Sequence, residues 1–127
     1  MFAESLDQIM DGLRHSKAIK VGVSLQGRFL SRLGQLSLVC LATDSAVYLF
    51  DVVALGQDVC FGGDVAAAED RPNLKTVMQH KAIQKVACDF RGANDLLFHQ
   101  FGIRVANLTD LTAGHATLFA MTTGLNN

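Results

Sequence analysis

Few side chains in this sequence have the types and spacing that chemistry at an active site requires. The four histidines and three cysteines show no zinc-binding spacing such as Cys-x-x-Cys. Cys88 could act as a nucleophile only beside a base, and none lies near it in the sequence, so we expect an inert core cysteine. Gly62–Gly63 is no phosphate-binding loop, because no Lys-Ser/Thr follows it. His99 is predicted to be a partly buried structural residue of a helix.

The charge of the chain limits the partners that it can hold. With 11 Lys and Arg against 12 Asp and Glu, the formal net charge is −1, so the chain has no bulk basic field for nucleic acid. Three arginines are candidates for a local contact with an RNA backbone: Arg28, Arg32 and Arg91. The alternative for all three is a solvated surface role. The odd number of cysteines indicates reduced thiols, and we expect a cytoplasmic protein.

The apolar pattern predicts the elements that must position these residues. Four apolar side chains near the start recur at helical spacing: Leu6, Ile9, Met10 and Leu13. They predict an amphipathic helix within residues 1–17, packed either on a sheet or on a partner chain. The next apolar stretches predict three strands, at Ala18–Leu25, Leu36–Ala42 and Ala46–Val53. The second of these is almost wholly apolar, which is typical of burial on both faces. The short links favour an antiparallel meander.

Helices and strands alternate after the third strand. Residues 54–71 are expected to form a long connection with one helical turn. Further on we expect a helix from Pro72 to about His80, a strand at Gln84–Cys88, a helix at Asn94–Phe101 ended by Gly102, a strand at Ile103–Ala106 and a helix from Asp110 to Phe119. This order implies an α/β domain with a mixed five-stranded sheet and helices on its faces.

Four segments carry a more specific signal. They are KVGVSLQG at 20–27, AVYLFDVVALG at 46–56, QKVACDFRGANDLLFHQFGI at 84–103 and NLTDLTAG at 107–114, followed by MTTG at 121–124. Together they resemble the 3′–5′ exonuclease domain of the DEDD superfamily, and most nearly its egalitarian and piRNA-pathway members. The resemblance implies an RNase H-like fold over residues 18–127, whose first three strands are antiparallel.

Most metal-binding carboxylates of that superfamily have no counterpart here. The Asp-x-Glu pair of the first motif matches Ser24 and Gln26, and the Asp of the second motif matches Ala93. The Asp of the following segment is kept as Asp110, for which a helix cap is the favoured role. The final motif of the family is not found, so we expect a domain that is truncated at its C-terminus.

The missing carboxylates decide the expected chemistry. Nucleases of this class hold two divalent cations between carboxylates, and Mg²⁺ prefers anionic oxygen ligands. Serine and glutamine are weak ligands and alanine is none. Asp95 cannot replace the residue at Ala93, because two residues on a helix are about 200° apart. We therefore expect no metal, no cofactor and no catalytic residue, which makes the chain a pseudo-nuclease.

The resemblance implies an RNA-binding or adaptor role in piRNA silencing. It also implies single-stranded RNA as a candidate ligand, a homodimer and a Tudor-domain protein as a partner. One alternative is a dimeric scaffold that binds only proteins, and another is an active metal-dependent exonuclease. No apolar run approaches the roughly 20 residues of a membrane-spanning helix, so we expect no membrane association.

Overall fold

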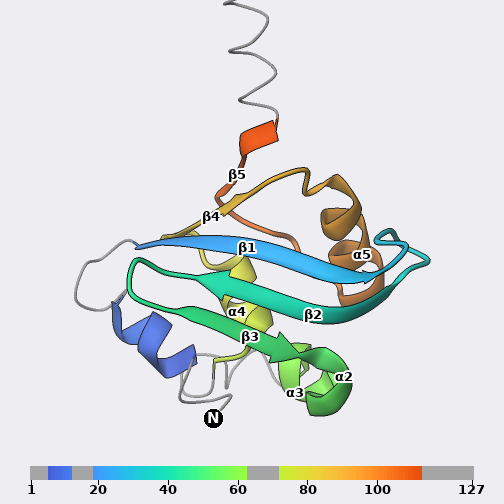
Figure 1. Ribbon diagram of the computed structural model, residues 1–127, viewed down its shortest axis with the longest axis horizontal. Helices are drawn as coiled ribbons and strands as arrows, with labels where there is room; N and C mark the ends of the chain where they lie inside the picture. The colour runs from blue at the N-terminus through green and yellow to red at the C-terminus, as the bar shows by residue number, and fades with distance from the viewer. Residues whose placement is uncertain (1–5, 13–18, 63–71, 113–127) are drawn as a thin grey trace, which may run out of the picture.

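A mixed five-stranded sheet forms the centre of the computed structural model, which describes residues 6–12, 19–62 and 72–112 (Figure 1). The strands are β1 (Ile19–Arg28), β2 (Gln35–Ala42), β3 (Val47–Asp51), β4 (Ile83–Ala87) and β5 (Leu108–Asp110), in the sheet order β3-β2-β1-β4-β5. β1 pairs with β2, and β2 with β3, in antiparallel fashion, whereas β1–β4 and β4–β5 are parallel. The predicted α/β fold class with its antiparallel first three strands is confirmed.

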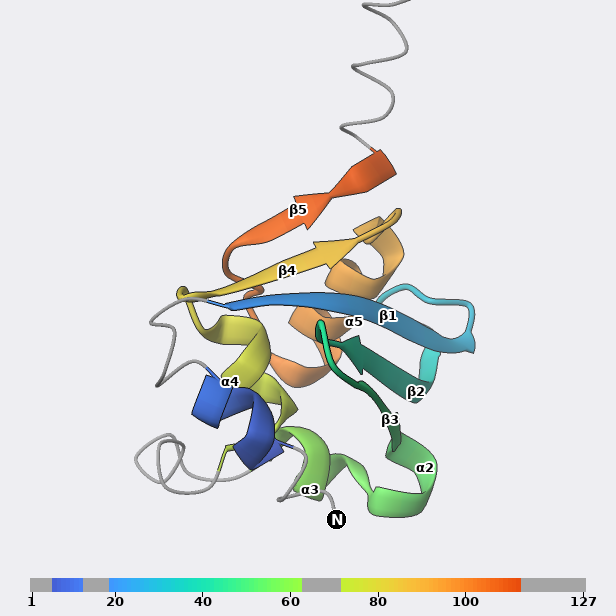
Figure 2. The same ribbon diagram turned by 60° about the vertical axis from the view of Figure 1, so that its left-hand side comes forward.

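The helices cover the sheet on the side that carries the core (Figure 2). They are α2 (Val52–Leu55), α3 (Gln57–Phe61), α4 (Leu74–Gln79) and α5 (Arg91–Phe101), and residues 6–12 are also helical. On β1 the buried residues Val21, Val23 and Leu25 alternate with open positions, as expected for a strand with one buried face. The opposite face of the sheet carries exposed side chains, among them Val47 and Leu49 of β3, both 66% exposed.

The N-terminal apolar stripe packs inside the chain. Leu6, Ile9 and Met10 are buried and belong to the same core as the sheet and α5, whereas Leu13 lies outside the described residues. We expected the stripe to pack either on a sheet or on a partner chain, and the structure shows it packed in the core beneath the sheet of the same chain. The described part of the stripe leaves no surface for a second chain.

The last strand lies later than predicted. Residues 102–106 are irregular and β5 begins at Leu108, so a strand at Ile103–Ala106 is wrong. The cause is the end of α5, where Gly102 is left-handed and the N–H of Ile103 donates to the carbonyl of Leu97. The N–H of Ala106 donates to Met78, so these donors are unavailable to a neighbouring strand. The predicted role of Gly102 at the helix end is confirmed.

Other boundaries also differ from the prediction, and three of them have a visible cause or a large shift. β3 ends at Asp51, because this side chain accepts a hydrogen bond from the N–H of Ala54 and begins α2. α4 begins at Leu74, with a capping box between Asn73 and Thr76, so Pro72 precedes the helix. α5 begins at Arg91, three residues earlier than expected. Beyond Thr112 the helix expected to follow Asp110 lies outside the described residues.

Candidate functional site

A pocket of about 650 Å³ opens where β1 and β4 meet the first turn of α5. Its lining is mostly small and uncharged. The side chains that could carry chemistry there are Ser24 of β1, Cys40 of β2, and Cys88 and Asp89 after β4. Ala93 of α5 and Leu111 after β5 complete this part of the wall.

The structure brings Ser24 and Ala93 to the same pocket. Ser24 is exposed on the open face of β1 and pairs with Cys40 across the antiparallel ladder. Ala93 is buried, 5% exposed, and lines the pocket from α5. Gln26 lies two residues further along β1, opposite Leu38, and is exposed outside the pocket lining. The four positions that match the family motifs are thus divided between the pocket and its surroundings.

The Asp110 side chain contacts the backbone of two residues that line the pocket. Its carboxylate accepts hydrogen bonds from the N–H groups of Asp89 at 3.0 Å, Phe90 at 2.9 Å and Thr112 at 3.0 Å. The bond from Phe90 does most to hold the pKa of Asp110 below its ordinary value, because each N–H favours the charged form. The carboxylate fixes the turn from β4 into α5, where Asp89 has a positive φ of 49°.

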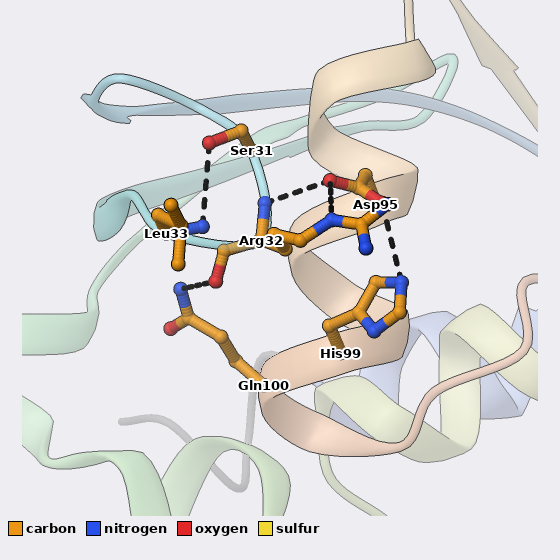
Figure 3. Close-up of polar contacts among 6 residues, drawn as sticks. All are labelled: Ser31, Arg32, Leu33, Asp95, His99 and Gln100. Atoms are coloured by element: carbon orange, nitrogen blue, oxygen red, sulfur yellow. Dashed lines mark hydrogen bonds and ion pairs between the residues drawn. The ribbon is translucent and has the colours of Figure 1, made fainter.

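The other two carboxylates nearby have cationic partners. Asp89 Oδ1 accepts from Nε of Arg91 at 3.1 Å. Asp95 lies between Arg32 and His99, with Oδ1 at 3.3 Å from Arg32 Nη2 and 3.4 Å from His99 Nε2 (Figure 3). Its contacts are with the β1–β2 loop, so the prediction that it points away from the pocket is confirmed. Among the described residues, no three His, Cys, Asp or Glu side chains come together to hold a metal ion.

The three candidate arginines are not part of the pocket lining, although each lies within two residues of a lining residue along the chain. Arg28 ends β1 and is exposed, Arg32 has a side chain that is 59% exposed, and that of Arg91 is 88% exposed. Arg32 belongs to a loop that α5 holds in place, because Gln100 donates to the carbonyls of Arg32 and Gly34. The site therefore has a mostly uncharged pocket in which Asp89 is the acidic residue, and a rim of arginine side chains, two of which are paired with aspartates.

A backbone contact sets the distance between that loop and the helix. Gly92, in the first turn of α5, lies so close to the loop that an added Cβ would be 2.2 Å from the carbonyl oxygen of Leu30. Only glycine permits this approach. No local sequence pattern indicates this contact, because the two segments are far apart along the chain.

The cysteines differ from the prediction. Cys88 is exposed and lines the pocket, so the expectation of a core residue is wrong. On β4 the buried side chains are Ile83, Lys85 and Ala87, and Cys88 is the next residue, on the open side. Cys40 is half-buried in the pocket, and the alternation on β2 shows that this strand is not buried on both faces. His99 is also more exposed than expected, at 39%.

The comparisons with known proteins agree with this geometry. No protein-family model matches the chain. It is 39% identical over 112 residues to the piRNA biogenesis protein EXD1 of Xenopus laevis, and 33% identical over 112 residues to that of Mus musculus. These relatives support a DEDD-type 3′–5′ exonuclease domain related to EXD1. The matches cover 88% of the chain but only 22% and 18% of these EXD1 proteins.

Solved structures share the fold of this EXD1-related domain. RNase D of Trypanosoma brucei in complex with RNA U12 has a TM-score of 0.61 at 23% identity, covering 86% of the chain and 35% of RNase D. The exonuclease domain of EXD2 has a TM-score of 0.62 at 21% identity, covering 98% and 60%. At this identity the likeness establishes the RNase H-like fold alone. None of the helices in the described ranges has the length and apolar character needed to cross a membrane.

Proposed function

We propose that this EXD1-related domain is a catalytically inactive, RNA-binding adaptor of the piRNA pathway. The observation that carries the proposal is the pocket in which Ser24 and Ala93 stand where the family has carboxylates. The proposal also includes a homodimer and a Tudor-domain partner, which the family resemblance implies, and a cytoplasmic location, for which the odd number of cysteines is the reason.

The donor set of the pocket supports inactivity. Two divalent cations need several anionic oxygens between them. The hydroxyl of Ser24 is neutral and the methyl group of Ala93 is no ligand. The carboxylate of Asp110 accepts hydrogen bonds from three backbone N–H groups, and that of Asp89 is paired with Arg91. These residues do not fit the metal pair of the family, so we derive no catalytic step.

The rim supports a role in binding. Arg28, Arg32 and Arg91 are exposed, and although Arg32 and Arg91 are paired with Asp95 and Asp89, guanidinium groups this open to solvent can also contact phosphate groups. Asp89 supplies the one carboxylate among the described residues that line the pocket, and it is paired with Arg91, so the pocket repels an RNA backbone less than a cluster of carboxylates would when no cation is present. The relatives named as piRNA biogenesis proteins and the RNase D complex with RNA point to RNA as the ligand class.

Inactivity and binding can be tested together on the full chain. End-labelled single-stranded RNA is incubated with Mg²⁺ or Mn²⁺, and its affinity is measured by fluorescence polarisation at two salt concentrations. We expect a salt-dependent binding curve and no shortened product. Shortening that requires the metal and disappears in Asp110→Asn would establish an active nuclease and refute the proposal.

A scaffold that binds only proteins is the second candidate. Val47 and Leu49 on the open sheet face are each 66% exposed, and Leu111 beside the pocket is 49% exposed. Apolar side chains left in water favour a protein contact. The same titration separates the two candidates, because the scaffold predicts no RNA binding at either salt concentration.

A further inference from the structure

An exposed row of basic and aromatic side chains runs along α5, away from the pocket. The helix buries Ala93, Leu96 and Leu97 against the core. Its opposite side exposes Arg91, Asn94, Phe98 and His99. Because residues three and four apart share one face of a helix, Arg91, Asn94 and Phe98 follow one another along this side. The row starts at the pocket, since Phe90 and Gly92 beside Arg91 line it.

The far end of the row is an aromatic residue with a cation above it. The guanidinium carbon of Arg104 lies 5.1 Å from the centre of the Phe98 ring, and the His99 ring meets that ring edge-on at 5.0 Å. Phe98 is 43% exposed and is not part of the buried core. A phenyl ring held at the surface beside an arginine is the combination on which bases of single-stranded nucleic acid stack.

The acidic residues of this surface already have partners. Asp95 accepts from the backbone N–H of Arg32 at 2.8 Å as well as from its side chain, and it contacts His99 (Figure 3). Asp89 is paired with Arg91. Arg104 has no acidic partner among the described residues; its guanidinium lies over Phe98. Arg104 therefore places a positive charge without an acidic partner, among the described residues, at the far end of the row, and this suits a phosphodiester chain.

We infer that the row from Arg91 to Phe98 and Arg104 binds single-stranded RNA outside the pocket. A base stacks on the Phe98–Arg104 pair, and the guanidinium groups of Arg104 and Arg91 contact phosphate oxygens. The inference rests on the proposed RNA-binding function and assigns the bound RNA to this surface of α5. It also explains how a domain with a net charge of −1 can hold RNA, because only a local strip is needed.

Two variants of the full chain test the row with a short fluorescent oligouridine. Phe98→Leu keeps an apolar side chain but removes the ring, so we expect affinity to fall by roughly tenfold with the salt slope unchanged. Arg104→Gln removes one charge, and we expect weaker binding and a salt slope smaller by about 1. Phe29→Leu, at another ring that is 82% exposed, and Lys81→Gln, in the turn before β4, are the matched controls. Both should bind like the wild type.

The outcomes separate this inference from the function on which it rests. A wild-type chain that binds no oligouridine refutes the proposed function and the row together. Wild-type binding that persists unchanged in both Phe98→Leu and Arg104→Gln refutes only the row. Melting temperatures close to that of the wild type establish that the exposed substitutions leave the fold intact, so a loss of affinity then supports the inference.

Discussion

The carboxylate of Asp110, at the end of β5, caps α5 through the backbone N–H of Phe90 at 2.9 Å. Phe90 is the N-cap residue of that helix and has no side-chain cap of its own. A carboxylate at this position satisfies an orphan donor and complements the positive end of the helix dipole. The one acidic residue kept from the family motifs therefore connects the last strand to the helix that lines the pocket.

We predict that Asp110→Asn lowers the melting temperature by several degrees at neutral pH. The pKa of Asp110 is held below its ordinary value, so its stabilisation is fully present above that ordinary value and is lost as the pH falls through the folded one. The difference in melting temperature between wild type and variant should therefore narrow on acidification below about pH 4. Thermal unfolding at pH 7 and pH 3 measures it. A constant difference would show that the charge of Asp110 is not involved.

Lys85 provides a prediction about the core. Its side chain is fully buried, and Nζ donates to the carbonyl of His80 at 2.8 Å. Burial lowers the pKa of Lys85 to about 8. Because the folded pKa lies below the unfolded one, the protonated form destabilises the fold, and the free energy of unfolding should rise between pH 8 and about 10.4.

The variant Lys85→Met should remove that dependence. We expect it to be more stable than the wild type at pH 7 by about 1–2 kcal/mol, since a buried charge is lost. The carbonyl of His80 keeps a donor in the N–H of Ile83. Urea unfolding of both chains at pH 7 and pH 10 measures the gap, which should shrink at the higher pH. A variant that is less stable at pH 7 would mean that the Lys85–His80 bond outweighs the burial of charge.

The three cysteines should react with iodoacetamide in a fixed order. Cys88 is exposed, Cys40 is half-buried, and Cys60 is buried with a pKa raised by burial and by the charge of Asp51. Because the thiolate is the reactive form, Cys88 should be modified first and Cys60 only after unfolding. Mass spectrometry of peptides over time gives the order. Rapid modification of Cys60 in the folded chain would contradict its burial.

At Gly92, whether alanine raises or lowers the free energy of unfolding tests the close contact with the β1–β2 loop. Alanine normally stabilises a helix relative to glycine by about 1 kcal/mol. At Gly92 the added Cβ would press on the carbonyl of Leu30, so Gly92→Ala should instead destabilise the chain by about 1–3 kcal/mol. Asn94→Ala, at an exposed position of the same helix, should be neutral or stabilising. Urea unfolding compares them, and a stabilising Gly92→Ala would mean that the loop yields easily.

Features that depend on local pattern could be predicted from the sequence. The apolar stretch Ala18–Leu25 predicted most of β1, and the glycine at Gly102 predicted the end of α5. The partners of Asp110 could not be predicted, because Asp89 and Phe90 meet it only through the pairing of β4 with β5. The exposure of Cys88 could not be predicted because apolar and polar residues are mixed along β4. Such a pattern does not indicate which face of the sheet the residue after the strand lies on.

The burial of Ala93 has a consequence for any carboxylate placed at this position. At 5% exposure, the position now belongs to the apolar core as well as to the pocket wall. An aspartate regained there alone would be a poorly solvated charge without a cation to share, and its cost falls on the stability of the whole chain. Carboxylates at positions 24, 26 and 93 would also repel one another unless a divalent cation lay between them. Ala93→Asp alone should therefore lower the stability of the chain, whereas an acidic residue at the exposed positions Ser24 and Gln26 carries no such burial cost.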